Sequence, residues 1–422
     1  MKQKIKDFYV NALVDSAVDR KRYYDPVTGR FMSYVVHNED GTRIEPEKGK
    51  GWAIFFQDDV LGFAYLYHTP YANNPFYKDP ETYELICKAV QAWRDFQNED
   101  GTMEFIKPNG DCFGPIYMPW SWYHWLETYA VMRDALPEAV RADWEAGLTP
   151  GLESYAKQDP TDIHNIPVWQ AMCVHRAGKL FGRQDWVDAG SALIENACKE
   201  QHPDGFWPEF QGPCVGYNNV YLRSIALYYL HGGKADVLPT IKRAMRFTKM
   251  FTYPGGTSND TIDGRQHYLP YARNSVTTIF ALPAFTITES GIAYLASMLT
   301  PYLAAATPMY FMASLLLALD SDQTLPNSND DILSDAALPD FSAVYGKATI
   351  VRKNNSQVTL SAYTAPLTES RWGMDRQFFA SVWTEDADLL MGSANSKNQI
   401  ELSTFVISDE NGKTKCWINR SF

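Results

Sequence analysis

A helical spacing of apolar residues runs through most of this 422-residue chain, from about residue 7 to residue 320. Apolar side chains recur there every three or four positions, the period of an amphipathic helix, whereas the two-residue alternation of strands is scarce. The spacing is clearest at residues 83–97, 122–136, 168–182, 186–199, 220–233 and 296–319. The chain is therefore predicted to be mainly α, built as a long series of helices.

Asp-Gly turns recur between the predicted helices. EDGTMEF (99–105) and PDGFWPEF (203–210) share Asp-Gly, a short spacer and Glu-Phe, and TIDGRQHY (261–268) holds a third Asp-Gly. Glycine tolerates the positive φ that lets a chain reverse. The three glycines are 104 and 59 residues apart, close to two helical hairpins and one. Such repetition predicts an incomplete (α/α) toroid, in which the turns on one rim surround a common cleft.

The composition changes near Leu325. Residues 326–345 are rich in Asn, Asp, Ser and Pro and read as a linker. Short alternating runs such as QVTLSAYT and IELSTFVIS follow, separated by turn residues, and they are typical of antiparallel strands. The predicted organisation is an α/α toroid catalytic domain at 1–325, a linker at 326–345 and a small antiparallel β-sheet domain at 346–422.

Charge and composition limit the classes of partner. A formal net charge of −12 argues against nucleic acid or an anionic membrane surface, since both require a basic face. The six cysteines show no metal-ligand spacing, and neither a metal nor another cofactor is expected. The apolar stretch 292–319 contains Pro301 and Pro308, which predicts two packed helices and no membrane span. The sequence leaves the oligomeric state open.

The charged N-terminal segment lacks the apolar core of a signal peptide. A cytoplasmic location is therefore expected for the sequence as it stands, or a periplasmic or secreted one if a signal has been removed.

Aromatic residues make up 14% of the chain and gather in predicted loops. The stretch GPIYMPWSWYHWLETY (114–129) contains Trp120, Trp122 and His124, and Trp207 lies in the second Asp-Gly loop. Flat rings on a toroid rim could stack against sugars, and these three Trp side chains are predicted to form the walls of subsites. The alternative is that they belong to a Trp-rich helical core.

Three stretches resemble the heparinase II/III-like group of polysaccharide lyases, in which an α/α toroid precedes a β-sandwich. They are DIHNIPVWQAMCVHRAGKLFG (162–182), DGFWPEFQGPCVGYNNVYL (204–222) and RQFFASVWTEDADLLMGSANS (376–396). The resemblance implies that Asn165 neutralises a substrate carboxylate and that Tyr217 is the catalytic tyrosine. The histidine that such lyases often contribute from the β-domain has no match in WGMDRQ (372–377).

The chemistry that this resemblance implies is β-elimination in an acidic glycan. The proton at C5 of a uronic acid is only weakly acidic while the neighbouring carboxylate keeps its charge. An amide such as Asn165, or a cation such as Arg265, can bind that carboxylate and stabilise the charge that develops. A tyrosine near such cations can take the proton and return it to the leaving oxygen. Tyr217 is the first candidate for this role, and Tyr221, one turn further along, is the second.

A polar loop supplies further candidates. TIDGRQHYLPYARNS (261–275) gathers cations and aromatic side chains in an otherwise acidic protein. His267 is the expected second acid-base group. The other predicted substrate-binding residues are His164 and Glu209 and, in the polar loop, Tyr268, Tyr271 and Arg273.

Other functions and simpler roles remain open at this stage. A glycoside hydrolase on the same toroid, for instance a glucuronidase, needs two carboxyl groups, and Asp58, Glu209 and Asp263 are among those near predicted turns. A third class is a non-catalytic glycan-binding protein. Asn165 could simply cap a helix that Pro167 opens, and Tyr217 could be a core tyrosine.

Overall fold

The computed structural model describes residues 1–31, 36–37, 43–44, 57–106, 112–209, 212–254, 256–263, 277–321, 340–363, 380–392, 404–408 and 414–417. The described part is mainly helical, as predicted. Its α-helices are α1 (Lys2–Arg20), α3 (Val60–His68), α4 (Pro80–Phe96), α5 (Pro119–Met132), α6 (Glu138–Ala156), α7 (Asn165–Phe181), α8 (Gln184–Lys199), α9 (Val215–Leu230), α10 (Leu238–Met250), α11 (Glu289–Ser297), α12 (Pro301–Ala306) and α13 (Met309–Asp320). Its short 3-10 helices are η1 (Lys21–Tyr23), η2 (Ala235–Val237), η3 (Asp260–Ile262) and η4 (Thr277–Thr286).

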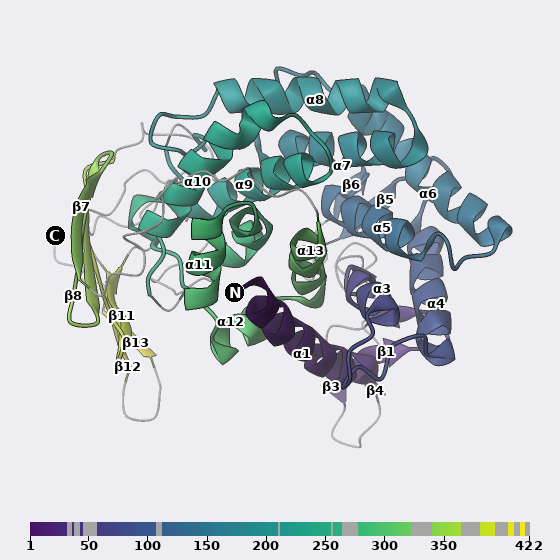
Figure 1. Ribbon diagram of the computed structural model, residues 1–422, viewed down its shortest axis with the longest axis horizontal. Helices are drawn as coiled ribbons and strands as arrows, with labels where there is room; N and C mark the ends of the chain where they lie inside the picture. Colours follow the sequence, from purple (N-terminus) through teal and green to yellow (C-terminus); the bar gives the residue numbers. More distant parts are fainter. Residues whose placement is uncertain are drawn as a thin grey trace.

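The helices form a toroid of inner and outer elements (Figure 1). The inner positions are taken in order by α3, α5, α7, α9, η4 and α13, and each packs against the next until α13 meets α3. Outer helices such as α4, α6, α8 and α10 cover this ring. The predicted α/α toroid is confirmed, with the 3-10 helix η4 at one of its inner positions.

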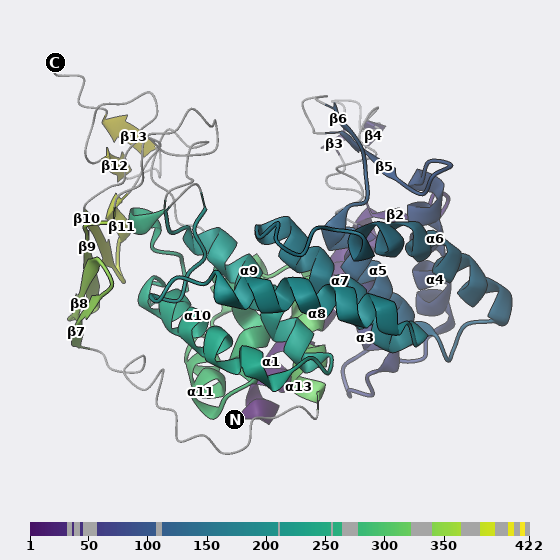
Figure 2. The ribbon, with the colours of Figure 1, turned by 90° about the horizontal axis from the view of Figure 1, so that it is seen from above.

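The inner helices run in the same direction. The indole Nε1 of Trp169, near the start of α7, donates to the carbonyl of Pro119 at the start of α5, at 2.9 Å. Gly62, near the start of α3, lies against Met309, the first residue of α13. The hairpins β3–β4 and β5–β6 rise on one side of the ring, as Figure 2 shows. Because β5–β6 leads directly into α5, this is the side where the inner helices begin.

Two of the Asp-Gly turns are built alike. Gly101 and Gly205 have φ of 82° and 88°. The side-chain amide of Gln97 donates to the carbonyls of Gly101 and Gly147, and that of Gln201 donates to those of Gly205 and Thr240. Each glutamine thereby fastens its turn to the next outer helix. The predicted hairpin repeat is thus visible in the hydrogen bonds, while Gly264 lies outside the described residues.

The segment 292–319 differs from the two helices predicted for it. It contains the end of α11 followed by α12 and α13. Pro301 is the first residue of α12, and Pro308 directly precedes α13, since proline fits a helix start and interrupts a helix interior. In the described part of the chain, no helix combines the length and the apolar character needed to cross a membrane.

The described C-terminal strands form one antiparallel sheet in which each strand pairs with its neighbour in sequence. They are β7 (Phe341–Tyr345), β8 (Ala348–Lys353), β9 (Ser356–Ser361), β10 (Ala380–Thr384), β11 (Asp388–Gly392), β12 (Thr404–Ser408) and β13 (Thr414–Trp417). The short N-terminal strands are β1 (Tyr24–Asp25), β2 (Arg30–Phe31), β3 (Val36–His37) and β4 (Arg43–Ile44), and β5 (Met103–Ile106) pairs with β6 (Cys112–Ile116).

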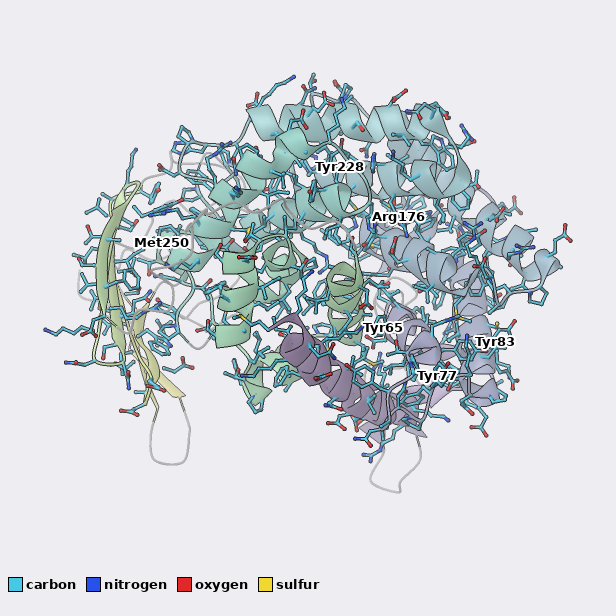
Figure 3. All side chains as sticks on the ribbon, in the orientation of Figure 1. Tyr65, Tyr77, Tyr83, Arg176, Tyr228 and Met250 are labelled. Atoms are coloured by element: carbon cyan, nitrogen blue, oxygen red, sulfur yellow. The ribbon has the colours of Figure 1, made fainter. Side chains whose placement is uncertain are left out.

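The C-terminal sheet begins earlier than expected. Strand β7 occupies residues that were predicted to belong to the linker, and it pairs along its whole length with β8. Its aromatic ends explain this difference, because Phe341 and Tyr345 pack against an apolar cluster that includes Met250 and Ile350. Met250 lies at the end of α10 beside the sheet (Figure 3). The sheet is thus attached to the toroid by a shared core.

Candidate functional site

The candidate site lies where α7 and α9 begin. Helix α7 starts at Asn165, with His164 as the extended residue before it and Pro167 in its first turn. The Asn165 side chain makes no capping hydrogen bond, so the simple capping role is wrong. Instead its Nδ2 donates to Oε1 of Glu209, at 3.1 Å.

Glu209 connects the two inner helices. Its backbone exchanges hydrogen bonds with Gly212, which turns the chain towards α9. Its Oε1 accepts from Asn165 of α7 and from the Tyr221 hydroxyl of α9, the latter at 3.3 Å. The side chain is buried, and a buried carboxylate requires such donors. Two residues predicted for the site, Asn165 and Tyr221, therefore donate to the same carboxylate oxygen of a third, Glu209.

Tyr217 lies one helical turn before Tyr221. The four-residue spacing places both side chains on the same face of α9, with Tyr217 nearer the helix start. Tyr217 is half-buried, whereas Tyr221 is buried. Helix α9 is capped from a distant segment, since Asp263 Oδ2 accepts from the backbone N–H of Val215 at 3.2 Å. The helix start that holds Tyr217 is fixed by this carboxylate.

The predicted aromatic walls are corrected in part. Trp122 is fully buried, and its indole donates to the Leu148 carbonyl, so it is a core residue with no face for a sugar. Trp207 is also buried and lies flat against Tyr221, with centroids 4.9 Å apart. Its place is behind the candidate site, where it supports the Tyr221 ring. Trp120 is half-buried and packs edge-on against Trp169, at 4.6 Å.

The predicted histidines take different positions. His164 is partly exposed at the start of α7, with Nε2 3.5 Å from a carboxylate oxygen of Asp162. His124 is buried inside the ring, beside the rings of Trp169 and Phe311, and its role in substrate binding stays a prediction. Burial lowers the pKa of His124 well below its usual range, assisted by the Arg223 cation. Outside the described residues lie Arg265, His267, Tyr268, Tyr271 and Arg273.

A closed ion-pair network fills the ring further from the helix starts. Arg176 Nε lies 2.6 Å from Oε1 of Glu127, and the same oxygen is 3.8 Å from His231 Nε2. The Tyr123 hydroxyl lies 3.1 Å from that histidine nitrogen. Burial acts to raise the pKa of Glu127, but Arg176 and His231 outweigh it and the pKa lies below its usual range.

Sequence reasoning missed charged residues of the interior, among them Arg223. Arg223 of α9 is completely buried, beside the rings of Trp169 and Phe311. A signal was present in the sequence, because Arg223 is a single charge within the otherwise apolar stretch VYLRSIALYYL (220–230). A charged side chain on a helix that is apolar on all sides is costly to bury unless it serves a purpose.

Within the described segments, no group of three or more His, Cys, Asp or Glu side chains is arranged to hold a metal ion.

No family model matches the sequence, and no curated protein matches it in sequence. Solved structures do match the fold. The chondroitin AC lyase of Streptomyces coelicolor A3, solved in complex with chondroitin sulphate, aligns with a TM-score of 0.52 at 11% identity over 97% of this chain. Heparinase III aligns with a TM-score of 0.50 at 11% identity, also over 97% of the chain. This chain spans only 61% and 63% of those two proteins. It has the fold of the heparinase II/III-like polysaccharide lyases, an α/α toroid followed by an antiparallel sheet.

Proposed function

We propose that this protein is a carbohydrate-active enzyme that cleaves uronic-acid-containing glycans by β-elimination. The observation that carries the proposal is the meeting of Asn165 and Tyr221 on the Glu209 carboxylate, at the start of two inner helices of a lyase-type toroid. An amide, a carboxylate and two tyrosines thereby share one end of the ring. The two lyases resemble this chain in fold alone. The substrate and the reaction are therefore part of the proposal.

Asn165 has a donor left for the substrate. An Asn amide nitrogen carries two hydrogens, and Glu209 accepts one of them. This hydrogen bond fixes the plane of the amide, so that the second N–H is held in one direction. A uronate carboxylate placed there would be stabilised as charge develops on it during removal of the C5 proton. Fixed donors of this kind stabilise such a transition state without reorganising.

Tyr217 is the proposed base and acid. It is half-buried on the same face of α9 as Tyr221, so its hydroxyl is carried on the side of the helix that faces the Glu209 cluster. In the proposed step the Tyr217 oxygen takes the C5 proton, the C4–oxygen bond breaks, and the proton passes to the leaving oxygen. Arg265 and His267 keep their proposed roles as the cation and the second acid-base group.

The experiment is an ultraviolet assay of products across a panel of acidic polysaccharides and oligosaccharides. Elimination leaves a C4–C5 double bond that absorbs in the ultraviolet, whereas hydrolysis does not. Wild type is expected to give absorbance with at least one glycan, and Tyr217→Phe is expected to lower kcat by about 10²–10⁴-fold.

Tyr228→Phe is the matched control on the same helix. Tyr228 lies three turns after Tyr217 on α9, and its hydroxyl donates to Ser191 of α8 (Figure 3). This variant loses a buried hydroxyl without touching the candidate site, and its kcat should remain within a few-fold of wild type. If Tyr217→Phe forms the ultraviolet-absorbing double bond at the wild-type rate, the proposed role of Tyr217 is wrong.

A glycoside hydrolase is the second candidate, and one observation favours it. Two buried carboxyl groups bind α9 near its start, because Asp263 accepts from the Val215 backbone N–H and Glu209 accepts from the Tyr221 hydroxyl. Hydrolysis by retention or inversion requires such a pair. New reducing ends without ultraviolet absorbance, abolished in Glu209→Gln, would establish this function in place of the lyase.

A further inference from the structure

Arg223 is a buried cation without an acceptor. The side chain has no exposed surface, and among the described residues none accepts a hydrogen bond from its Nε, Nη1 or Nη2. Its guanidinium carbon lies 4.3 Å from the centroid of Phe311 and 5.4 Å from that of Trp169. Ring faces offset only part of the cost of removing a cation from water. The guanidinium is thus held by aromatic walls with its donors unused.

Unused polar groups also lie on the other side of these walls. The His124 ring is 6.2 Å from Trp169 and 6.3 Å from Phe311, centroid to centroid. Its Nδ1 is 3.1 Å from Oδ2 of Asp58, yet within the described part of the chain neither atom completes a hydrogen bond. The aromatic region of Trp169 and Phe311 therefore gathers Arg223 and His124, with Asp58 beside His124. Among the described residues, the polar side-chain atoms of these three residues have no hydrogen-bond partner.

Burial shifts the pKa of each of these three groups. Burial lowers the pKa of Arg223 to about 10, so it stays a cation at neutral pH. Burial raises the pKa of Asp58 well above its usual range, with Ser121 opposing the shift, and burial lowers the pKa of His124. The neighbouring Asp59 does not help, because it is paired with Arg20 at 2.7 Å. Among the described residues, no carboxylate forms an ion pair or hydrogen bond with the Arg223 guanidinium.

The same ring holds a half-buried arginine that a carboxylate satisfies. Arg176 is bound through two nitrogens to Glu127, further from the helix starts. Arg223, two residues after Tyr221, instead leaves α9 on a different face from that tyrosine, and its guanidinium reaches the ring of Trp169, one turn beyond Asn165 on α7. Among the described residues Arg223 has no acceptor, whereas Arg176 has Glu127. This contrast indicates that the missing acceptor of Arg223 comes from a ligand.

We propose that Arg223 forms an oxyanion subsite that receives a carboxylate or sulfate group of the glycan, one level deeper in the ring than Asn165. The guanidinium donates two parallel hydrogen bonds to such a group, which is the geometry that Arg favours for planar and tetrahedral oxyanions. Anion binding follows from Arg223 itself, and only the identification of the anion as part of a glycan substrate rests on the proposed function.

Thermal unfolding in the presence of small probes tests the subsite. Sodium sulfate and sodium D-glucuronate represent the two sources of oxyanion, with sodium chloride at equal ionic strength and D-glucose as controls. Sulfate stabilises proteins in general, so the relevant quantity is the shift in Tm of wild type minus that of Arg223→Met. This difference is expected to be positive for at least one of the two anions and zero for chloride and glucose.

The response of each anion identifies the source. A difference with glucuronate alone assigns a carboxylate, and one with sulfate alone assigns a sulfate ester. Arg223→Lys keeps the cation but loses the fork of donors, and it should bind the same anion about tenfold more weakly. Equal shifts in wild type and Arg223→Met with both anions would overturn the proposal, whether or not any glycan is cleaved.

Stability of the two arginine variants gives an independent readout. Arg223→Met, without ligand, should melt at or above the wild-type Tm, because it removes a buried charge that has no partner. Arg176→Met should melt well below it, because it strands Glu127. If Arg223→Met is destabilised as strongly as Arg176→Met, Arg223 is a structural residue and the subsite is wrong. Loss of elimination with anion binding intact would instead refute only the proposed lyase activity.

Discussion

The Nδ2 atom of Asn165 lies 3.1 Å from the Oε1 atom of Glu209, and this contact joins the first residue of α7 to the loop that leads into α9. The two residues are 44 positions apart in sequence. The toroid brings them together because its inner helices run in the same direction and begin on the same side. The same contact fixes the plane of the Asn165 amide, whose nitrogen carries a second hydrogen.

Loss of the Asn165 amide should affect catalysis more than folding. Asn165→Ala removes the fixed donor proposed for the substrate carboxylate, and kcat is expected to fall by about 10²–10³-fold. Asn196→Ala is a matched control on α8, because the Asn196 side chain donates to the Pro160 carbonyl and accepts from Lys199, and among the described residues it makes no hydrogen bond to the candidate site. Steady-state kinetics of both variants, with circular dichroism to confirm folding, decide the point. An Asn165→Ala enzyme with unchanged kcat contradicts the proposed role.

The Asp-Gly turn before Glu209 should tolerate no side chain. A Cβ atom on Gly205 would lie 2.3 Å from the Arg243 carbonyl oxygen, and its φ of 88° is unfavourable for Ala. Gly182→Ala is the control, since Gly182 has φ of 69° but no atom within 4 Å of such a Cβ. The control isolates the cost of positive φ, about 1–2 kcal/mol. Urea unfolding should show a clearly larger loss for Gly205→Ala, and equal losses would mean that the turn is not packed as described.

The pair of buried Glu127 and half-buried Arg176 should be far more sensitive to losing one partner than to losing both. Arg176→Met leaves the Glu127 carboxylate buried without its counter-charge, and a loss of about 3–5 kcal/mol is expected, with a smaller loss for Glu127→Gln because Arg176 keeps some contact with water. Replacing both residues by Met should recover much of that loss. Unfolding free energies of the two single variants and the double variant test this coupling, which would be refuted by additive losses.

Stability should decline on acidification partly because of His231. Burial lowers the pKa of His231 from 6.5 to about 3, with Glu127 opposing the shift. Between these values the unfolded chain binds a proton that the folded protein does not, so the unfolding free energy falls as the pH falls. One such group contributes a slope of at most about 1.4 kcal/mol per pH unit. His231→Gln should show a shallower fall from pH 6.5 downwards, and parallel curves would contradict the assignment.

The fold was predictable because its signals are local. Apolar periodicity marks a helix whatever it packs against, and the glycines of two Asp-Gly turns do adopt positive φ. The start of β7 was not predictable from local signals. Its residues follow a polar stretch, and what makes them a strand is the packing of Phe341 and Tyr345 against α10, a contact between distant segments.

The candidate site was only partly predictable. Asn165 and Tyr217 came from a family resemblance, and the structure places them at the same end of the ring. The burial of Trp122 and Trp207 could not be read from their loop-like surroundings, because the direction of a ring depends on which helix lies behind it. Arg223 had a visible signal in its apolar helix, but its lack of an acceptor is a property of the assembled ring alone.

The most direct test of the central claim uses a substrate carrying deuterium at C5 of the uronic acid. With whichever acidic glycan is cleaved, mass spectrometry of the products reports the fate of that atom. If Tyr217 removes the C5 proton, the deuterium is lost from the unsaturated product and cleavage is slower than with hydrogen. Tyr217→Phe then abolishes the loss of deuterium. Products that retain the deuterium and have gained the mass of a water would contradict it.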